Sequence, residues 1–331
     1  MTDRPEILAS SAVASVVHDV HIDALRVYGA STGFGIRRAG DGIGLLRDLL
    51  RHSRSGKTLF IQSTGPSNFL TLPVARLLGW RVIYYFHEPT SLHFKLNNKD
   101  NCLKAVIKQC VQFLDAKLSS VILISREQLR QNVVDLCRVK PDRIALAPLL
   151  LPEVSLSAVG NRNRITYLGR ADRRRMLEEF VSLAGLFRVN GLQPTILTGD
   201  PKGLEAIVGT RTDAVDVHAV KGFSEGLKKQ ILEESCLIWN PKSTEIAQSG
   251  VTVDALRFGV TSVLNRYDPD YEALLSEGAA IDYDQFVDAL KGGYFDAAAL
   301  HDVNAAALGY FDRSHGQQAF EASYRHVLTG Y

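Results

Sequence analysis

The stretch VIYYFHEP, residues 82–89, decides the fold class of this chain. Its first five residues form an unbroken apolar and aromatic run, as in strands that a parallel sheet buries on both faces. The run ends on His87, Glu88 and Pro89. The carboxyl ends of such strands are where α/β proteins bind ligands. The stretch therefore predicts a parallel sheet and makes His87 a candidate site residue, against the alternative of a purely structural strand end.

Apolar runs alternate with segments of helical period along the rest of the chain, which is the signature of βαβ units. The expected strands are 25–28, 58–62, 81–86, 120–124, 143–146, 165–169, 194–198, 215–219, 237–240 and 261–265. The expected helices are 42–52, 68–78, 102–117, 126–137, 172–187, 224–235, 250–258 and 284–292. Residues 6–17 fit either a strand or a short helix, because periodicity cannot separate the two at this length.

A stretch without period at 150–164, rich in Pro, Ser, Gly and Asn, reads as a linker between two such sets. We therefore expect two Rossmann-like, doubly wound α/β domains, 1–155 and 156–310. A helix in 311–331 is expected to pack back on the first domain. The site is expected where the carboxyl ends of the two sheets face each other across a cleft.

Composition excludes several classes of function. A net charge of +2 over 331 residues gives no global field for nucleic acid, so no such partner is expected. The four cysteines lack zinc-site spacing, and no metal is expected. No window reaches the roughly 20 apolar residues of a membrane span. Residues 5–17 carry an acid and lack a basic start, so we expect no signal peptide and a cytoplasmic protein.

A glycine-rich stretch, GASTGFGIRRAGDGIG at 29–44, follows the expected strand 25–28 and precedes an expected helix. Gly33 and Gly35 would let the backbone approach a ligand closely. The helix amides beyond them would face an anion. The alternative is a flexible turn.

The stretch ITYLGRADRRR, 165–175, ends an expected strand on glycine and then supplies Arg170, Arg173, Arg174 and Arg175. Guanidinium groups bind phosphate oxygens in pairs, so this pattern suits a diphosphate. The alternative is a solvated basic turn.

The stretch NPKSTEIAQSGVTVDALRFG, 240–259, combines two acids with a helix start. Glu245 lies in the loop, Ser249 is a good N-cap, and Asp254 falls in the first turns. Carboxylates suit sugar hydroxyls, and the free amides of Gly250 and Val251 suit a phosphate. The alternative is a capped helix with a surface acid.

Together these stretches resemble glycosyltransferase family 4, the group 1 transferases of the GT-B fold, from about residue 24 onward. The stretches that carry the resemblance are FHEP (86–89), SSVILISREQLRQNV (119–133), DRIALAPLLLP (142–152), ITYLGRADRRRMLEEFVSLAGLF (165–187), ILTGD (196–200), VKGFSEGLKKQILEES (220–235) and WNPKSTEIAQSGVTVDALRFGVTSVLN (239–265). The resemblance implies retaining transfer of a sugar from a nucleoside-diphosphate-sugar donor, without metal or other cofactor. It implies a glycan or lipid-linked acceptor in bacterial cell-surface polysaccharide biosynthesis.

The resemblance also implies roles for single residues. Arg170 takes the place of the arginine that grips the diphosphate, and Arg175 falls where lysine is usual. His87 matches the histidine that borders the transferred sugar or the acceptor. Gly33 and Gly35 match the loop of the first domain that approaches the phosphates.

The acids match the E-x7-E motif with departures. Glu245 corresponds to the first glutamate, near the sugar, and Asp254 to the second, at the ribose. The second acid is an aspartate, and the spacing is one residue longer. The glycines after the first acid are replaced at 246–248, and Met176 replaces a usual glycine.

Because the sequence departs from the family motif at these positions, two other functions remain possible interpretations. One is a GT-B nucleotide-sugar epimerase, which would need no acceptor. The other is a catalytically degenerate binding or scaffold member of the fold. The segment 94–117 carries five lysines among apolar residues, which fits a core-packing helix or a peripheral contact with anionic membrane at the inner face.

Overall fold

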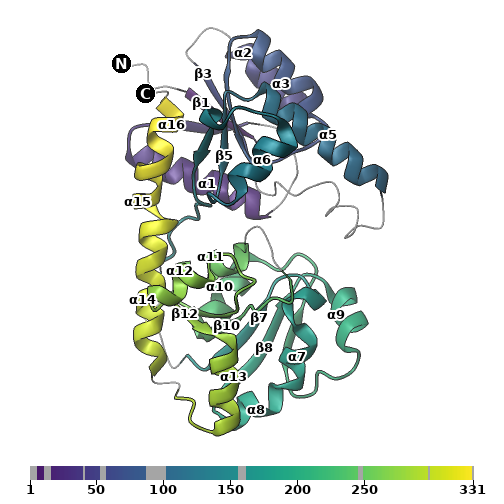
Figure 1. Cartoon of the computed structure of the whole chain (residues 1–331), viewed down its shortest axis with the longest axis vertical. Coiled ribbons are helices and arrows are strands. Elements are labelled where there is room, and N and C mark those ends of the chain that lie inside the picture. Colours follow the sequence, from purple (N-terminus) through teal and green to yellow (C-terminus); the bar gives the residue numbers. More distant parts are fainter. Residues whose placement is uncertain are drawn as a thin grey trace. The chain divides into compact units, whose positions relative to one another are not determined.

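The computed structural model describes residues 6–10, 16–39, 42–52, 57–86, 102–155, 162–244, 249–296 and 299–329. The chain forms two compact units (Figure 1). Unit 1 comprises Met1–Pro152 and Ser314–Tyr331, and unit 2 comprises Glu153–Arg313. Each unit contains a six-stranded parallel sheet, so the expected α/β class with two doubly wound parallel sheets is confirmed.

The sheet of unit 1 has the order β2-β1-β3-β4-β5-β6, and every pairing is parallel. Its strands are β1 (Glu6–Ser10), β2 (Gly35–Arg38), β3 (Lys57–Ile61), β4 (Arg81–Tyr85), β5 (Val121–Ile124) and β6 (Ile144–Leu146). Val82, Ile83, Tyr84 and Tyr85 of β4 are all at most 1% exposed, so successive side chains are buried on both faces, as the opening stretch predicts.

The helices of unit 1 are α1 (Val16–Ser31), α2 (Ile43–Arg51), α3 (Asn68–Leu77), α5 (Cys102–Leu118) and α6 (Leu129–Cys137), followed at the end of the chain by α15 (Gln317–Ala319), a π-helical turn (Phe320–Tyr324) and α16 (Arg325–Thr329). The C-terminal helical stretch packs with α1 over one face of the sheet. Phe320, Tyr324 and Leu328 share a core cluster with Leu25 of α1 and Phe60 of β3.

The sheet of unit 2 has the order β12-β11-β10-β7-β8-β9 and is parallel throughout. Its strands are β7 (Arg164–Leu168), β8 (Gln193–Thr198), β9 (Asp216–Ala219), β10 (Ser235–Trp239), β11 (Thr261–Leu264) and β12 (Ala280–Asp282). Its helices are α7 (Leu177–Ser182), α8 (Ala184–Val189), α9 (Pro201–Val208), α10 (Glu225–Glu234), α11 (Gly250–Arg257), α12 (Tyr271–Ser276), α13 (Tyr283–Gly292) and α14 (Leu300–Ser314).

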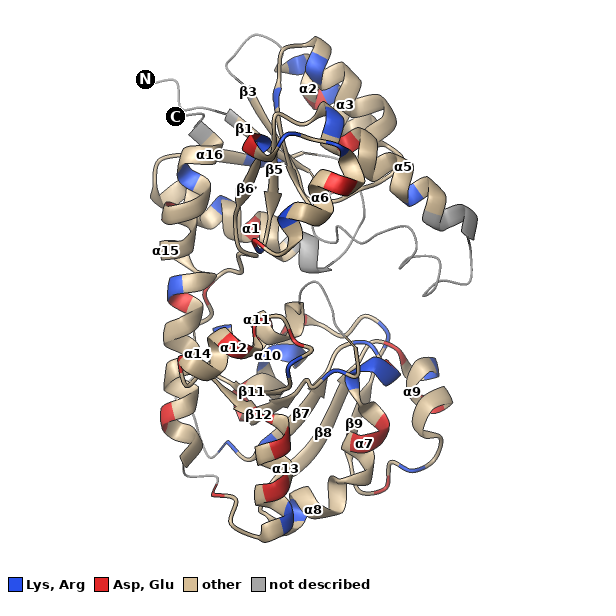
Figure 2. Ribbon diagram, in the orientation of Figure 1, with Lys and Arg blue, Asp and Glu red and all other residues tan. Residues whose placement is uncertain are grey.

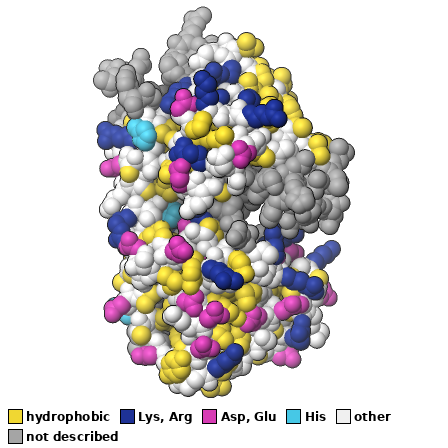
Figure 3. All heavy atoms as spheres, in the orientation of Figure 1, with side chains coloured by type: hydrophobic (Ala, Val, Ile, Leu, Met, Phe, Trp, Pro, Cys, Tyr) yellow, Lys and Arg dark blue, Asp and Glu magenta, His cyan; other side chains and the backbone are white. Residues whose placement is uncertain are grey.

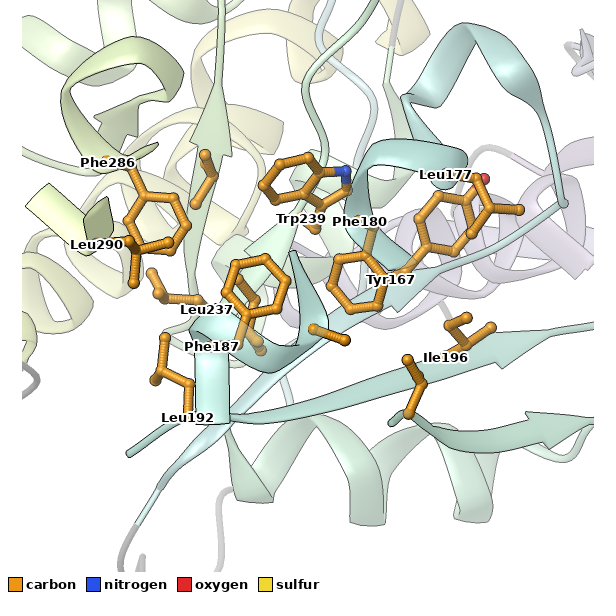
Figure 4. Packing of buried hydrophobic residues seen from close by; sticks show 14 of the residues in the cluster. Tyr167, Leu177, Phe180, Phe187, Leu192, Ile196, Leu237, Trp239, Phe286 and Leu290 are labelled. Carbon is orange, nitrogen blue, oxygen red and sulfur yellow. The ribbon is translucent and has the colours of Figure 1, made fainter. Parts of the chain in front are cut away.

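Each face of this sheet has its own core. On one face Trp239 of β10 packs against Phe180 of α7 and Phe187 of α8, and Phe187 also stacks on Phe286 of α13 (Figure 4). On the other face α10 and α11 cover the strands, and Leu168 of β7 belongs to that second cluster. Burial on both sides anchors the carboxyl ends of β7 and β10.

The prediction of a strand at 25–28 is wrong, because these residues lie inside α1. The buried side chains Ile22, Leu25 and Tyr28 follow one another at intervals of three, which places them on one helix face. The glycine-rich stretch therefore follows a helix and not a strand. The expected helix 172–187 is also divided, into a 3₁₀ turn (Arg173–Arg175), α7 and α8. The strands β2 and β12 were not expected.

Replacement of Phe187 by alanine is predicted to lower the free energy of unfolding of unit 2 by about 3–5 kcal/mol, because it empties a fully buried aromatic contact. Native-state hydrogen exchange of the β10 amides measures this loss for unit 2 alone. Val189→Ala, at an 84% exposed position of the same helix, is the matched control and should stay within about 0.5 kcal/mol of the wild type. Equal losses in both variants would contradict the packing described here.

Candidate functional site

The strand order of unit 2 reverses at β7. The chain runs from β7 outward to β8 and β9, and then returns to place β10 on the other side of β7. Ligands of open α/β sheets bind at such a switch point, in the crevice outside the carboxyl ends of the two strands. The loops in question here are 169–176, after β7, and 240–249, after β10. Figure 2 shows Lys and Arg gathered where the chain leaves β7.

Two residues of the loop after β7 and one residue of α11 meet at the switch point. Gly169 has a φ of 108°, in the left-handed region that glycine favours. A Cβ at this position would lie 2.7 Å from Nη1 of Arg175 and 3.4 Å from Cγ2 of Val251. The same Nη1 donates a hydrogen bond to the carbonyl oxygen of Leu168 at 3.1 Å. The guanidinium is therefore held against the end of β7, beside the first turn of α11.

The loop after β7 is held in shape from within. The buried Tyr167 donates a hydrogen bond to the carbonyl oxygen of Arg170 at 2.8 Å and accepts one from the amide of Asp172 at 3.2 Å. Burial raises the pKa of Tyr167 to about 12, so the hydroxyl stays neutral. Met176 closes the loop with a left-handed φ of 50°, which explains why glycine is usual there in the resembled family.

The other arginines of the loop point to different partners. The Arg170 side chain is 81% exposed, and its ion-pair partner among the described residues is Asp200, at 3.5 Å. Arg174 forms an ion pair with Asp172 at 2.6 Å. Burial opposes ionisation of Asp172, but the hydrogen bonds from Arg174 outweigh it and lower the pKa of that carboxyl. Arg173 lies 3.8 Å from Glu178. Arg170 and Arg175 are thus the arginines best placed for an added anion.

The N-terminus of α11 is fixed against β10. Ser249 caps the helix, and its hydroxyl accepts a hydrogen bond from the amide of Thr252 at 3.4 Å. The side-chain amide of Asn240 donates to Oγ of Ser249 at 2.9 Å and to Oγ1 of Thr252 at 2.8 Å. The amides of Gly250 and Val251 have no intrahelical partner at such a terminus, and the helix dipole makes this end positive.

Lys242 belongs to the same loop, and the sequence analysis missed it. Only 1% of the residue is exposed, and its ammonium donates to the carbonyl oxygen of Asn240 at 2.9 Å and to its Oδ1. Burial, followed by repulsion from Arg175, lowers the pKa of Lys242 to about 7, against the attraction of Asp268 and Asp172. No pattern in the sequence marks this lysine as buried.

Asp254 lies on α11 with both carboxylate oxygens engaged. Lys228 lies at 3.2 Å and Arg257 at 3.0 Å from them, and Glu225 pairs with the same two cations at 2.8 and 3.3 Å. The side chain of Asp254 is 19% exposed. A ribose contact through Asp254 would share the carboxylate with this network, and the role stays a prediction.

The remaining candidates lie in unit 1 or outside the described residues, and their roles stay predictions. Gly33 lies in the turn after α1, and Gly35 begins β2 in register with Glu6, the first residue of β1, at the amino edge of the sheet of unit 1. The strand expected before them, 25–28, lies inside α1, and their role at the phosphates stays a prediction. His87 and Glu245 lie outside the described residues. Across the described ranges, no group of three His, Cys, Asp or Glu is arranged to hold a metal.

These features bring the Arg175 guanidinium, the N-terminus of α11 and Gly169 together at the switch point, with the exposed Arg170 in the same loop. An anion with two or more negative charges is the ligand class that such an arrangement binds, through charge-assisted hydrogen bonds.

No family model and no curated protein matches the chain. Among solved structures, HepE from Anabaena in complex with UDP is similar at a TM-score of 0.69 and 8% identity, over 99% of this chain and 100% of that one. WaaG, a glycosyltransferase involved in lipopolysaccharide biosynthesis, is similar at 0.67 and 12% identity, over 98% and 100%. A structure from Listeria monocytogenes named for UDP-N-acetylglucosamine 2-epimerase reaches 0.59 and 10% identity, over 99% and 96%. These likenesses show the fold, which is GT-B.

Gly169→Ala is predicted to destabilise unit 2 by about 1–2 kcal/mol through its positive φ and to displace the Arg175 guanidinium. Gly191→Ala is the matched control, with a φ of 76° and nothing within 4 Å of the added Cβ. Both variants should lose similar stability in native-state hydrogen exchange. Only Gly169→Ala should lose affinity for UDP or pyrophosphate in calorimetry. Equal affinity in the two variants would separate Gly169 from the anion site.

Proposed function

We propose that this chain is a retaining glycosyltransferase of the group 1, family 4 type, which transfers a hexose from a nucleoside-diphosphate-sugar donor. The observation that carries the proposal is the contact of Gly169, Arg175 and Val251 at the switch point of unit 2. Similarity in fold to HepE, which was crystallised with UDP, supports the donor class. The acceptor is a glycan or a lipid-linked sugar, in bacterial cell-surface polysaccharide biosynthesis, as the family resemblance implies.

The proposed mechanism follows from where charge develops. As the bond between the sugar and the diphosphate breaks, negative charge grows on the leaving diphosphate. Arg170, Arg175 and the N-terminus of α11 would neutralise that charge without a metal ion. Only interactions that strengthen in the transition state accelerate the reaction, and pre-positioned donors do this at little reorganisation cost. Glu245 and His87 are proposed beside the transferred sugar.

A peripheral membrane contact suits a lipid-linked acceptor. The neighbouring helices α2, α3 and α5 of unit 1 expose large apolar side chains: Ile43, Leu50, Phe69, Leu70, Leu77, Val106, Ile107 and Phe113. Arg47, Arg51, Arg76 and Lys117 of the same helices are exposed too, and Figure 3 shows apolar and basic side chains side by side along this edge. Such a mixture binds anionic lipid surfaces. Within the described residues, no helix is long and apolar enough to span a bilayer.

Two alternatives each have an observation in their favour. The structural likeness to the Listeria epimerase favours conversion of a UDP-sugar without an acceptor. The ion pairs that occupy Asp254 favour a degenerate member that binds or scaffolds. An isomerised sugar without release of nucleoside diphosphate would identify the epimerase. Absence of any nucleotide binding would identify the scaffold.

Arg170→Ala and Arg175→Ala are predicted to lose roughly tenfold to a hundredfold in donor affinity or turnover, since a hydrogen bond to a charged group contributes about 1.5–3 kcal/mol. A thermal-shift screen with UDP, GDP, ADP and their sugars selects the donor. Calorimetry and nucleotide release from that donor then measure the loss.

Arg173→Ala removes a cation from the same loop, at a side chain that is 70% exposed. It should stay within about twofold of the wild type, because among the described residues its ion-pair partner is Glu178 of α7, while Arg175 is the arginine beside Gly169. A loss in Arg173→Ala as large as in Arg175→Ala would mean that any positive charge in this loop has the same effect on donor binding. That result would contradict the roles proposed for Arg170 and Arg175.

An acidic substitution among the exposed apolar side chains of α2, α3 and α5 is predicted to abolish the membrane contact. Leu70→Asp, at a 61% exposed position of α3, should sharply reduce sedimentation with vesicles that contain anionic lipid. Val189→Asp, at an exposed position of unit 2, is the control and should bind as the wild type does. If the wild type ignores anionic vesicles at low salt, the membrane proposal is wrong.

A further inference from the structure

The burial of Lys242 is the least expected feature of the site. Lysine is almost never fully buried unless it is paired. Both oxygens that accept from this ammonium belong to the neutral Asn240. Among the described residues of unit 2, no carboxylate forms a salt bridge with it. Its positive charge is thus enclosed next to Arg175, without a counter-charge in contact.

The ammonium acts on α11 through Asn240. It holds the side-chain oxygen of Asn240, which turns the amide nitrogen toward Ser249 and Thr252. Ser249 is the N-cap of α11 and Thr252 lies in its first turn, where the Thr252 hydroxyl donates a hydrogen bond to Asp268 at 3.3 Å. The backbone of Lys242 is fixed as well, since it exchanges two hydrogen bonds with the side chain of Asn265 at 3.1 and 2.7 Å. One lysine therefore sets the position of the helix N-terminus.

The electrostatics of this arrangement are unfavourable without a ligand. A cation near a helix N-terminus opposes the helix dipole, and Arg175 repels it further. Asp268 and Asp172 are the acids that act on the ammonium, from the loops after β11 and β7. Together they do not restore the usual pKa of the lysine, which stays near 7. An anion at α11 would supply the missing negative charge.

We propose that Lys242 is a positioning residue of the donor site: it holds Asn240 and the N-terminus of α11 in place for the donor diphosphate, whose charge in turn keeps its ammonium protonated. This inference rests on the proposed function and adds a coupling between donor binding and a proton. No covalent bond changes in this step. One proton passes from solvent to the lysine amine when the diphosphate binds.

The sign of the coupling follows from linkage. In the protein without ligand the pKa of Lys242 is about 7, and a bound anion raises this pKa. Below that pH the lysine is charged in both states, and affinity does not depend on this group. Above it, binding takes up a proton, so affinity falls by up to about tenfold for each pH unit until the pKa of the complex is reached.

The test is calorimetry with the nucleoside diphosphate that binds best among UDP, GDP and ADP. It is run at pH 8 in buffers of different ionisation enthalpy and repeated from pH 6 to 9. The second ionisation of a phosphate group, near pH 6, is complete at pH 8, so the ligand itself takes up no proton there. The wild type should take up close to one proton at pH 8 and lose affinity as pH rises.

Two variants distinguish the effect of a positive charge at position 242 from the effect of its titration. Lys242→Arg keeps a charge at every pH, so it should bind with a flat pH profile from pH 7 to 9, where the ligand is ionised, and with no proton uptake at pH 8. Lys242→Met removes the charge, and it should bind at least tenfold more weakly at pH 6 with a similarly flat profile. Circular dichroism and native-state exchange of the β10 amides establish that each variant is folded.

The outcomes are distinct for the two proposals. Nucleotide binding by the wild type without proton uptake and with a flat profile overturns the role of Lys242 alone. Proton uptake that persists in Lys242→Arg also overturns it, because another group would then titrate. Failure of the wild type to bind any of the three nucleotides overturns the proposed function, and this inference with it.

Discussion

The contact of the Arg175 guanidinium with Gly169 is the interaction on which the candidate site depends. It requires a residue without a side chain at the end of β7, a positive φ there, and a loop that returns the arginine to the strand it follows. Tyr167 shapes that loop from the core, and Ser243 joins it to the loop after β10 by a backbone hydrogen bond to Arg174 at 2.8 Å. Packing within unit 2 thus holds the loops of the candidate site in place.

Positive charge accumulates at this switch point, and few acids offset it. Arg175, the N-terminus of α11 and the buried Lys242 lie around it. Asp172 and Asp268 attract the Lys242 ammonium, but they do not restore the usual pKa of that lysine. Exposed ion pairs contribute little, whereas a buried charge such as that of Lys242 acts more strongly on a ligand placed beside it. The proposed binding of the donor diphosphate and the proposed proton coupling both follow from this excess of positive charge.

Much of the fold could be predicted because both sheets are parallel and buried on both faces. Continuous apolar runs such as 82–86 and 165–168 then mark strands clearly. The exception at 25–28 arose because a run of four residues is too short to show a period, and the helix around it became visible only through the buried positions Ile22, Leu25 and Tyr28. Strand β12, only three residues long, was below the length at which a pattern forms.

Some residues of the candidate site could be proposed from the sequence because local backbone chemistry marks them. A strand that ends in glycine and arginine, and a serine before a helix, are local signals, and the structure places Arg175 and Val251 together as those signals suggest. The burial of Lys242 and the ion pairs of Asp254 depend on residues far apart in the chain, such as Asp268 and Lys228. No local pattern contains that information.

Hydrogen–deuterium exchange of the wild type with and without saturating nucleoside diphosphate tests the central claim most directly. The account predicts that protection in unit 2 concentrates in the amides of 169–176 and 250–253, at the switch point. Saturating binding that leaves both segments unprotected, or that protects the opposite edge of the sheet instead, would contradict it.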